Sequence, residues 1–167
     1  AVGNEVMYRK DLSEDELLAF MHQVKEAIPE IPMGYVDAYY EFSNRPRITE
    51  ACDVILANCY PFWEGCSLEY SLIYMKEMYN QAVKAANGKK VIISETGWPS
   101  MGGSFQGSHP SFTNAMKYFI NTQLWSEEDE IDIFYFSSFD ESWKVGSEGD
   151  VGAFWGLWDK DEKLKKF

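Results

Sequence analysis

The chain has 167 residues, of which 46% are hydrophobic and 16% aromatic, enough for one sizeable hydrophobic core. Its net charge of −12 at pH 7 argues against nucleic acid and anionic membranes as partners, because both are bound mainly through Lys and Arg. A neutral polymer is compatible with this charge.

Short apolar segments alternate with helical patterns along the chain. The pattern predicts helices over residues 13–29, 47–51, 67–86 and 110–125, the first with Ser13 as N-cap and Glu16 completing a capping box. It predicts strands over residues 1–6, 33–40, 53–60, 90–95 and 131–139. The helix over 110–125 is expected to run from Pro110 through Phe112, Met116, Phe119 and Ile120 to Trp125.

Strands that alternate with helices predict βαβ units and a parallel sheet. The repeat of about 33 residues is the size of one βα unit in an eight-stranded (β/α)8 TIM barrel. A complete barrel needs about 250 residues, so this chain has room for about five units. We therefore predict an α/β fold, a partial (β/α) barrel, in one domain over residues 1–167.

No metal and no cofactor are expected. The three cysteines (Cys52, Cys59 and Cys66) have no zinc-motif spacing, and we expect buried thiols, with a Cys59–Cys66 bridge as the alternative.

The glycine-rich segment 102–107 lacks the Lys of a phosphate-binding loop. The longest apolar runs are too short to span a membrane.

Acids, amides and aromatic residues follow the predicted strands, at the end of the sheet where ligands bind in parallel βα folds. Glu5 ends the first strand, and Glu95 ends the fourth, just before a Gly-Trp-Pro turn. Two carboxyls, with amides and stacking rings, are the equipment for cleaving a glycosidic bond. The alternative is that such acids only cap helices.

The resemblance to a known family is strongest in residues 91–100, VIISETGWPS, which are similar to the signature of glycoside hydrolase family 17. That family holds β-1,3-glucanases, lichenases and β-1,3-glucan transglycosylases built on retaining (β/α)8 barrels. Residues 2–6 (VGNEV) resemble the family's acid/base motif on barrel strand 4. Residues 58–62 and 139–144, with 155–158, resemble its motifs on barrel strands 6 and 8. The chain would thus correspond to barrel strands 4 to 8.

The resemblance implies roles for individual residues. Glu95 would be the nucleophile and Glu5 the general acid/base, and a retaining pair stands ~5–5.5 Å apart. Asn4 would bind the sugar 2-hydroxyl, while Glu141 and Lys144 would tune the charge of the catalytic carboxyls. Five rings are candidate sugar platforms, with packing under a loop as the alternative for each: Tyr60, Phe62, Trp63, Trp98 and Trp143.

We therefore expect a retaining glycoside hydrolase that cleaves β-1,3-glucan by double displacement. Transglycosylation on the same glucan, a non-catalytic glucan binder and a cellulase-like barrel are the alternatives. The absence of barrel strands 1 to 3 has three explanations: a fragment of a longer enzyme, a barrel completed by another chain, or a free-standing partial barrel. In the last two, open sheet edges and bare apolar surface would favour association, with the chain itself or with a partner chain. The substrate class favours a secreted, periplasmic or cell-wall location.

Overall fold

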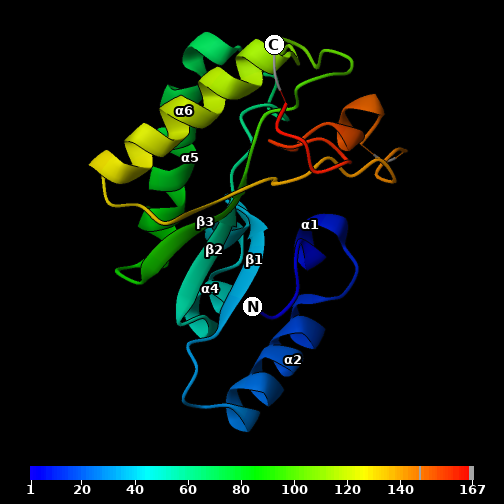
Figure 1. The fold of residues 1–167 in the computed structure, drawn as a ribbon. Coiled ribbons are helices and arrows are strands. Elements are labelled where there is room, and N and C mark those ends of the chain that lie inside the picture. Colours follow the sequence, from blue (N-terminus) through cyan, green and yellow to red (C-terminus); the bar gives the residue numbers. More distant parts are fainter. Residues whose placement is uncertain (147, 166–167) are drawn as a thin grey trace. The chain divides into compact units, whose positions relative to one another are not determined.

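The fold is α/β in a computed structural model that describes residues 1–146 and 148–165. The elements follow in this order: α1 (Val6–Arg9), α2 (Glu14–Ala27), β1 (Gly34–Ala38), α3 (Glu41–Asn44), α4 (Pro46–Ala51), β2 (Val54–Asn58), α5 (Leu68–Ala86), β3 (Lys90–Thr96), α6 (Phe112–Glu128), β4 (Ile133–Tyr135) and a 3-10 helix (Asp150–Ala153). The strands form one sheet in the order β1-β2-β3-β4, so each neighbour in the sheet is also the next strand in the chain. Figure 1 shows β1, β2 and β3 side by side.

The chain divides into two compact units. Unit 1 is Ala1–Cys59 with Lys76–Ser94, and unit 2 is Tyr60–Met75 with Glu95–Phe167. Within unit 1, β1 and β2 are parallel, and their register runs from Gly34 opposite Val54 to Ala38 opposite Asn58. The prediction of one domain over residues 1–167 stays a prediction.

The prediction of a strand over residues 1–6 is wrong. Only Asn4 makes a bridge, parallel to Val36 of β1, and the chain then enters helix α1 at Val6. The cause is the backbone of Glu5, which is left-handed with φ 54° and cannot continue an extended strand. The segment nevertheless lies along β1, because the Val2 N–H donates to the Gly34 carbonyl at 2.8 Å.

Helix α2 begins as predicted. The Ser13 side chain accepts from the Glu16 N–H, and the Glu16 carboxylate accepts from the Ser13 N–H at 2.8 Å, completing the capping box. Leu17 and Met21 on its inner face are buried.

Along helix α6, Phe112, Met116 and Phe119 are half-buried, whereas Ile120 is 52% exposed. The side chains that it buries are Ala115, Tyr118, Thr122 and Trp125.

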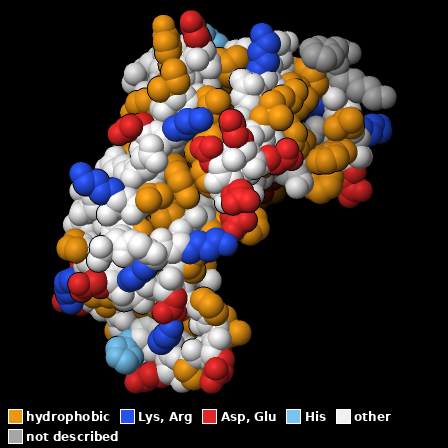
Figure 2. All heavy atoms as spheres, turned by 90° about the vertical axis from the view of Figure 1, so that its left-hand side faces the viewer, with side chains coloured by type: hydrophobic (Ala, Val, Ile, Leu, Met, Phe, Trp, Pro, Cys, Tyr) orange, Lys and Arg blue, Asp and Glu red, His pale blue; other side chains and the backbone are white. Residues whose placement is uncertain are grey.

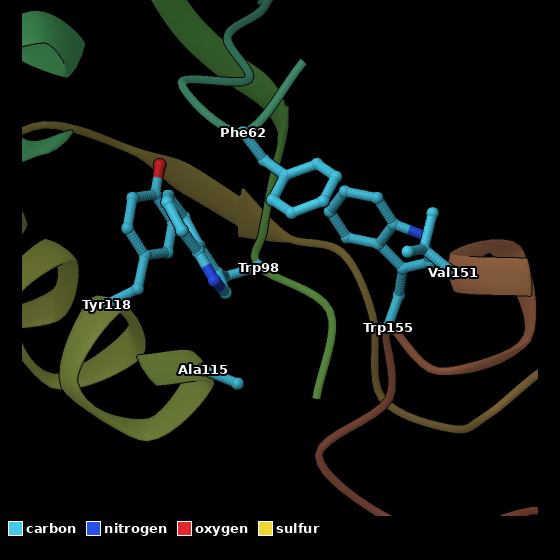
Figure 3. Close-up of a cluster of buried hydrophobic side chains, with 6 residues drawn as sticks. All are labelled: Phe62, Trp98, Ala115, Tyr118, Val151 and Trp155. Carbon is cyan, nitrogen blue, oxygen red and sulfur yellow. The ribbon is translucent and has the colours of Figure 1, made fainter. Parts of the chain in front are cut away.

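An aromatic cluster forms the core of unit 2 (Figure 3). Its buried members are Phe62, Trp98, Ala115, Tyr118, Val151 and Trp155. The rings of Phe62 and Trp98 meet edge to face with centroids 5.3 Å apart, the arrangement that aromatic pairs prefer. This core lies beside the chain that leaves β3, so it supports the segment after Glu95.

On the face drawn in Figure 2, basic side chains lie among acidic and hydrophobic ones. The exposed hydrophobic residues include Tyr70 and Ile73 of α5 and Leu124 of α6. Across the described residues, none of the helices is both long and apolar enough to cross a membrane.

Candidate active site

Glu5 occupies a constrained position in unit 1. Its N–H donates to the Val36 carbonyl of β1 at 2.9 Å, and it is the N-cap of α1 with a left-handed backbone. Gly3 makes the preceding turn with φ 79°, and a Cβ on it would come within 2.9 Å of the Val6 side chain. A non-glycine residue with positive φ costs free energy and persists only where its surroundings hold it.

The surroundings that hold Glu5 include Asp37, a fully buried acid of β1. Its carboxylate accepts from the N–H groups of Met7 at 3.2 Å and Tyr8 at 3.3 Å, and also from the Tyr35 hydroxyl. Burial and, next, the hydrogen bond to Asp37 raise the pKa of Tyr35, so its hydroxyl stays protonated at neutral pH. Asp37 thus fixes the start of α1, and with it the backbone of Glu5.

The Glu5 carboxylate has two polar neighbours in unit 1. Asn58, the last residue of β2, donates from Nδ2 to Glu5 Oε1 at 3.0 Å. Arg9 Nη1 lies 3.6 Å from Glu5 Oε2, and the two side chains are 47% and 27% exposed. Such a solvent-exposed ion pair contributes little to stability. Asn4, the predicted ligand of the 2-hydroxyl, also accepts from Asn58 Nδ2, at 3.3 Å.

Glu95 lies in unit 2 and is the last residue but one of β3, just before Thr96. The Tyr60 hydroxyl donates to Glu95 Oε2 at 2.8 Å. A Cβ on Gly97 would come within 2.0 Å of the Phe136 carbonyl oxygen, so only glycine fits two residues after Glu95. The close backbone approach is reinforced by the Phe136 N–H, which donates to the Thr96 carbonyl at 2.8 Å.

The five predicted platforms differ in exposure. Phe62 and Trp98 are buried in the aromatic cluster, so their rings are packed as the alternative interpretation expected and offer no face to a sugar. Tyr60 is half-buried and uses its hydroxyl on Glu95. Trp63 is half-buried against the cluster, and Trp143 is 72% exposed. Trp143 is therefore the ring most open to a ligand among the five.

Glu141 and Lys144 lie together in unit 2. Lys144 Nζ is 3.7 Å from the Glu141 carboxylate and 3.1 Å from that of Glu148. The same ammonium lies 4.2 Å from the centroid of the Phe136 ring, which is a cation–π distance. The predicted pair is thus a cluster of two acids around one cation, with Glu148 as its third member.

A buried ion pair was missed by the sequence reasoning. Lys165 Nζ donates to Asp140 Oδ1 at 2.6 Å and to the Ser100 hydroxyl at 2.6 Å, and the pair's side chains are 13% and 9% exposed. Asp140 Oδ1 also accepts from the Gly156 N–H at 2.9 Å. The pair fixes the segment before Glu141, and the sequence signal for it was only an acid at a strand end.

In residues 1–146 and 148–165, no three His, Cys, Asp or Glu side chains are grouped so that they could hold a metal ion.

The family model of the BtgE/BtgC glycoside hydrolase domain matches residues 1–156. The chain belongs to the BtgE/BtgC glycoside hydrolase family. This membership confirms the resemblance to a β-glucan-acting glycoside hydrolase family that the motifs indicated.

Curated relatives of this BtgE/BtgC domain are named glucan 1,3-beta-glucosidases. The relative from Arthroderma benhamiae is 31% identical over 98% of this chain and 58% of its own length. The relative called BGL2 from Candida albicans is 30% identical over 98% of this chain and 60% of its own. The chain thus spans about 60% of the length of these two curated relatives.

A solved structure with the same fold is that of the glycoside hydrolase family 17 beta-1,3-glucanosyltransferase from Rhizomucor miehei. It is 37% identical, with a TM-score of 0.91 over 98% of this chain and 60% of that chain. An active-site mutant of that protein was solved in complex with laminaritriose, and it matches with a TM-score of 0.90. The match confirms the predicted fold class, a partial barrel.

Proposed function

We propose that this BtgE/BtgC domain acts on β-1,3-glucan as a retaining glycoside hydrolase, with Glu95 as nucleophile and Glu5 as general acid/base. The observation that carries the proposal is that each carboxylate accepts from a neutral donor, one at the last residue of β2 and the other two residues further along the chain. Asn58 donates to Glu5, and Tyr60 donates to Glu95. A neutral donor orients a carboxylate without removing its charge or its reactivity.

The reaction proceeds in two displacements. Glu95 attacks the anomeric carbon of the glucosyl unit while the Glu5 carboxyl gives its proton to the departing glycosidic oxygen. The bond from the anomeric carbon to the leaving sugar breaks as the bond to Glu95 forms. Glu5, now ionised, takes a proton from water, and that water releases glucose units from Glu95 with retained configuration.

The other predicted residues act on binding. Asn4 hydrogen-bonds the sugar next to the scissile bond, and Trp143 offers an exposed ring for stacking. Lys144 pairs with Glu141 and Glu148 in unit 2, and this cluster tunes the charge of the catalytic carboxyls. Phe62 and Trp98 support the site from the core and are no longer proposed as platforms.

The names of the relatives support β-1,3-glucan as the substrate, since they are called glucan 1,3-beta-glucosidases. Transfer to a second sugar is the other candidate, because the Rhizomucor miehei structure is named a glucanosyltransferase. The two activities share the glycosyl-enzyme and differ in whether water or a sugar hydroxyl accepts the glucosyl unit.

The test is the incubation of laminarin and laminari-oligosaccharides with the protein, beside Glu95→Gln and Glu5→Gln. The proposal is supported if the parent releases reducing sugar and Glu95→Gln releases it at least about 10³-fold more slowly. Elongated oligosaccharides would assign transfer as the main activity. Binding of oligosaccharide with no turnover by a well-folded parent would instead support the non-catalytic alternative.

The covalent step has its own readout. A 2-deoxy-2-fluoro laminaribiosyl fluoride should leave its sugar on Glu95, because the 2-fluoro group slows both displacements while the anomeric fluoride, a good leaving group, keeps the first one fast. Mass spectrometry of the peptide containing residues 91–100 would show the added sugar. A label on any other carboxylate contradicts the assignment of the nucleophile.

A further inference from the structure

We infer that Ser94 and Asn58 are positioning residues for Glu5: the Ser94 hydroxyl fixes the amide of Asn58, and that amide fixes one oxygen of Glu5. The inference rests on the proposed function, in which Glu5 gives a proton to the leaving sugar. It adds Ser94, which has no part in the proposed function, and it explains how Asn58 keeps its orientation toward Glu5.

The hydrogen bonds form a chain within unit 1. Ser94 Oγ donates to Asn58 Oδ1 at 2.7 Å. Asn58 Nδ2 donates to Glu5 Oε1 at 3.0 Å and to Asn4 Oδ1 at 3.3 Å. Asn58 is only 3% exposed, so water has little access to replace these bonds. The Asn58 amide therefore has both of its ends occupied by protein groups.

The direction of the chain follows from what each group can do. An ionised carboxylate only accepts hydrogen bonds, so the NH₂ end of the Asn58 amide must face Glu5. The oxygen end then faces Ser94, whose hydroxyl must donate to it. Without that hydroxyl, a buried carbonyl oxygen loses its partner and nothing at position 94 opposes rotation of the amide. A rotated amide would place its oxygen against Glu5 Oε1, where it repels the carboxylate.

The chain also distinguishes the two oxygens of Glu5. Oε1 accepts from Asn58 at 3.0 Å, whereas among the described residues Oε2 has the partly exposed Arg9 guanidinium at 3.6 Å as its polar neighbour. Oε2 is therefore the oxygen that carries the proton and delivers it to the leaving sugar. Loss of the hydrogen bond from the Asn58 amide lets the proton move to Oε1 and lets the carboxyl rotate. Acid catalysis is then weaker, although the acid itself is still present.

The experiment compares two leaving groups, so that activity lost through weaker proton donation can be told from activity lost for any other reason. A laminari-oligosaccharide departs as a poor leaving group and needs a proton, while 2,4-dinitrophenyl β-laminaribioside departs without one. The ratio kcat/KM covers steps up to the glycosyl-enzyme, which is where the leaving group departs. We expect Ser94→Ala to lower kcat/KM at least about tenfold on the oligosaccharide and less than about threefold on the dinitrophenyl substrate.

Three further variants complete the design. Ser94→Thr keeps the hydroxyl and should restore activity on the oligosaccharide. Asn58→Asp keeps the side-chain size but puts an acceptor against Glu5, so it should show the same selective loss. Ser126→Ala is the matched control, because Ser126 Oγ donates to the Ile131 carbonyl at 2.7 Å in α6, outside this chain of hydrogen bonds.

Equal losses on both substrates in Ser94→Ala and Asn58→Asp would overturn the inference, since a purely structural role affects every substrate alike. So would unchanged activity in Ser94→Ala. A different outcome overturns the proposed function: Glu5→Ala would then change kcat/KM by the same factor on the oligosaccharide and on the dinitrophenyl substrate. Melting temperatures of all variants show whether each one is folded.

Discussion

At the scale of single residues, Tyr60 was predicted to stack on a sugar, but its hydroxyl hydrogen-bonds the carboxylate of Glu95. Its hydroxyl donates to Glu95 at 2.8 Å, and its ring meets Trp155 edge to face with centroids 5.4 Å apart. The aromatic contact fixes the ring, and the ring aims the hydroxyl. A hydrogen bond to a charged group is worth more than one between neutral groups, so this contact matters to the nucleophile.

Tyr60→Phe keeps the ring and removes only the hydroxyl. We expect kcat on laminari-oligosaccharides to fall about 10- to 100-fold, which corresponds to roughly 1.5–3 kcal/mol for a hydrogen bond to a charged group. Steady-state kinetics measures this, with Tyr70→Phe on the exposed face of α5 as the matched control. An unchanged kcat in Tyr60→Phe would mean that the hydroxyl does not assist Glu95.

At the scale of elements, one acid connects three of them. Asp53 directly precedes β2, and its carboxylate accepts from the Met33 N–H at 2.8 Å just before β1 and from Lys25 of α2. The Lys25 ammonium and, after it, the Met33 N–H lower the pKa of Asp53 from its ordinary value of 3.8. An acid with a lowered pKa stabilises the fold above its unfolded pKa and loses this contribution as the pH falls through its folded pKa.

Asp53→Asn should therefore be less stable than the parent at pH 7, and the difference should shrink as the pH falls below about 3.8. Urea unfolding midpoints at pH 7 and pH 3 measure both quantities. Glu30→Gln, at an exposed position, is the control and should differ little from the parent at either pH. A difference for Asp53→Asn that stays constant with pH would show that the charge is not what connects the elements.

The elements also show what the sequence could and could not reveal. The β-branched run before Glu95 predicted β3, and the spacing of Ser13 and Glu16 predicted the start of α2, because both signals are local. The expected strand over residues 1–6 failed because the left-handed backbone of Glu5 is stabilised by contacts with β1, which lies more than 25 residues away. The burial of Trp98 could not be predicted either, since an aromatic residue looks the same in a core and in a cleft.

At the scale of the whole molecule, the three thiols report whether the chain is folded. All three are free, and burial raises the pKa of Cys52 to about 11 and also raises the pKa values of Cys59 and Cys66. Because the thiolate is the form that reacts, the native protein at pH 7.5 should be alkylated slowly by iodoacetamide. In urea, all three thiols should react, and intact mass would count the added groups. Cys59 is buried, so its fast alkylation without denaturant would contradict this prediction.

The division of the chain into units affects how it can be recombined with its relatives. The boundaries at residues 59/60, 75/76 and 94/95 split α5 and β3, and neither unit is one continuous stretch of sequence. A chimera with a single crossover inside residues 60–94 therefore mixes parental sequences within at least one unit. Exchanging a complete unit takes all three junctions at once, and the third junction passes between Ser94 and Glu95. Gene-shuffling libraries for this family should accordingly treat residues 60–75 and 95–167 as one inherited block.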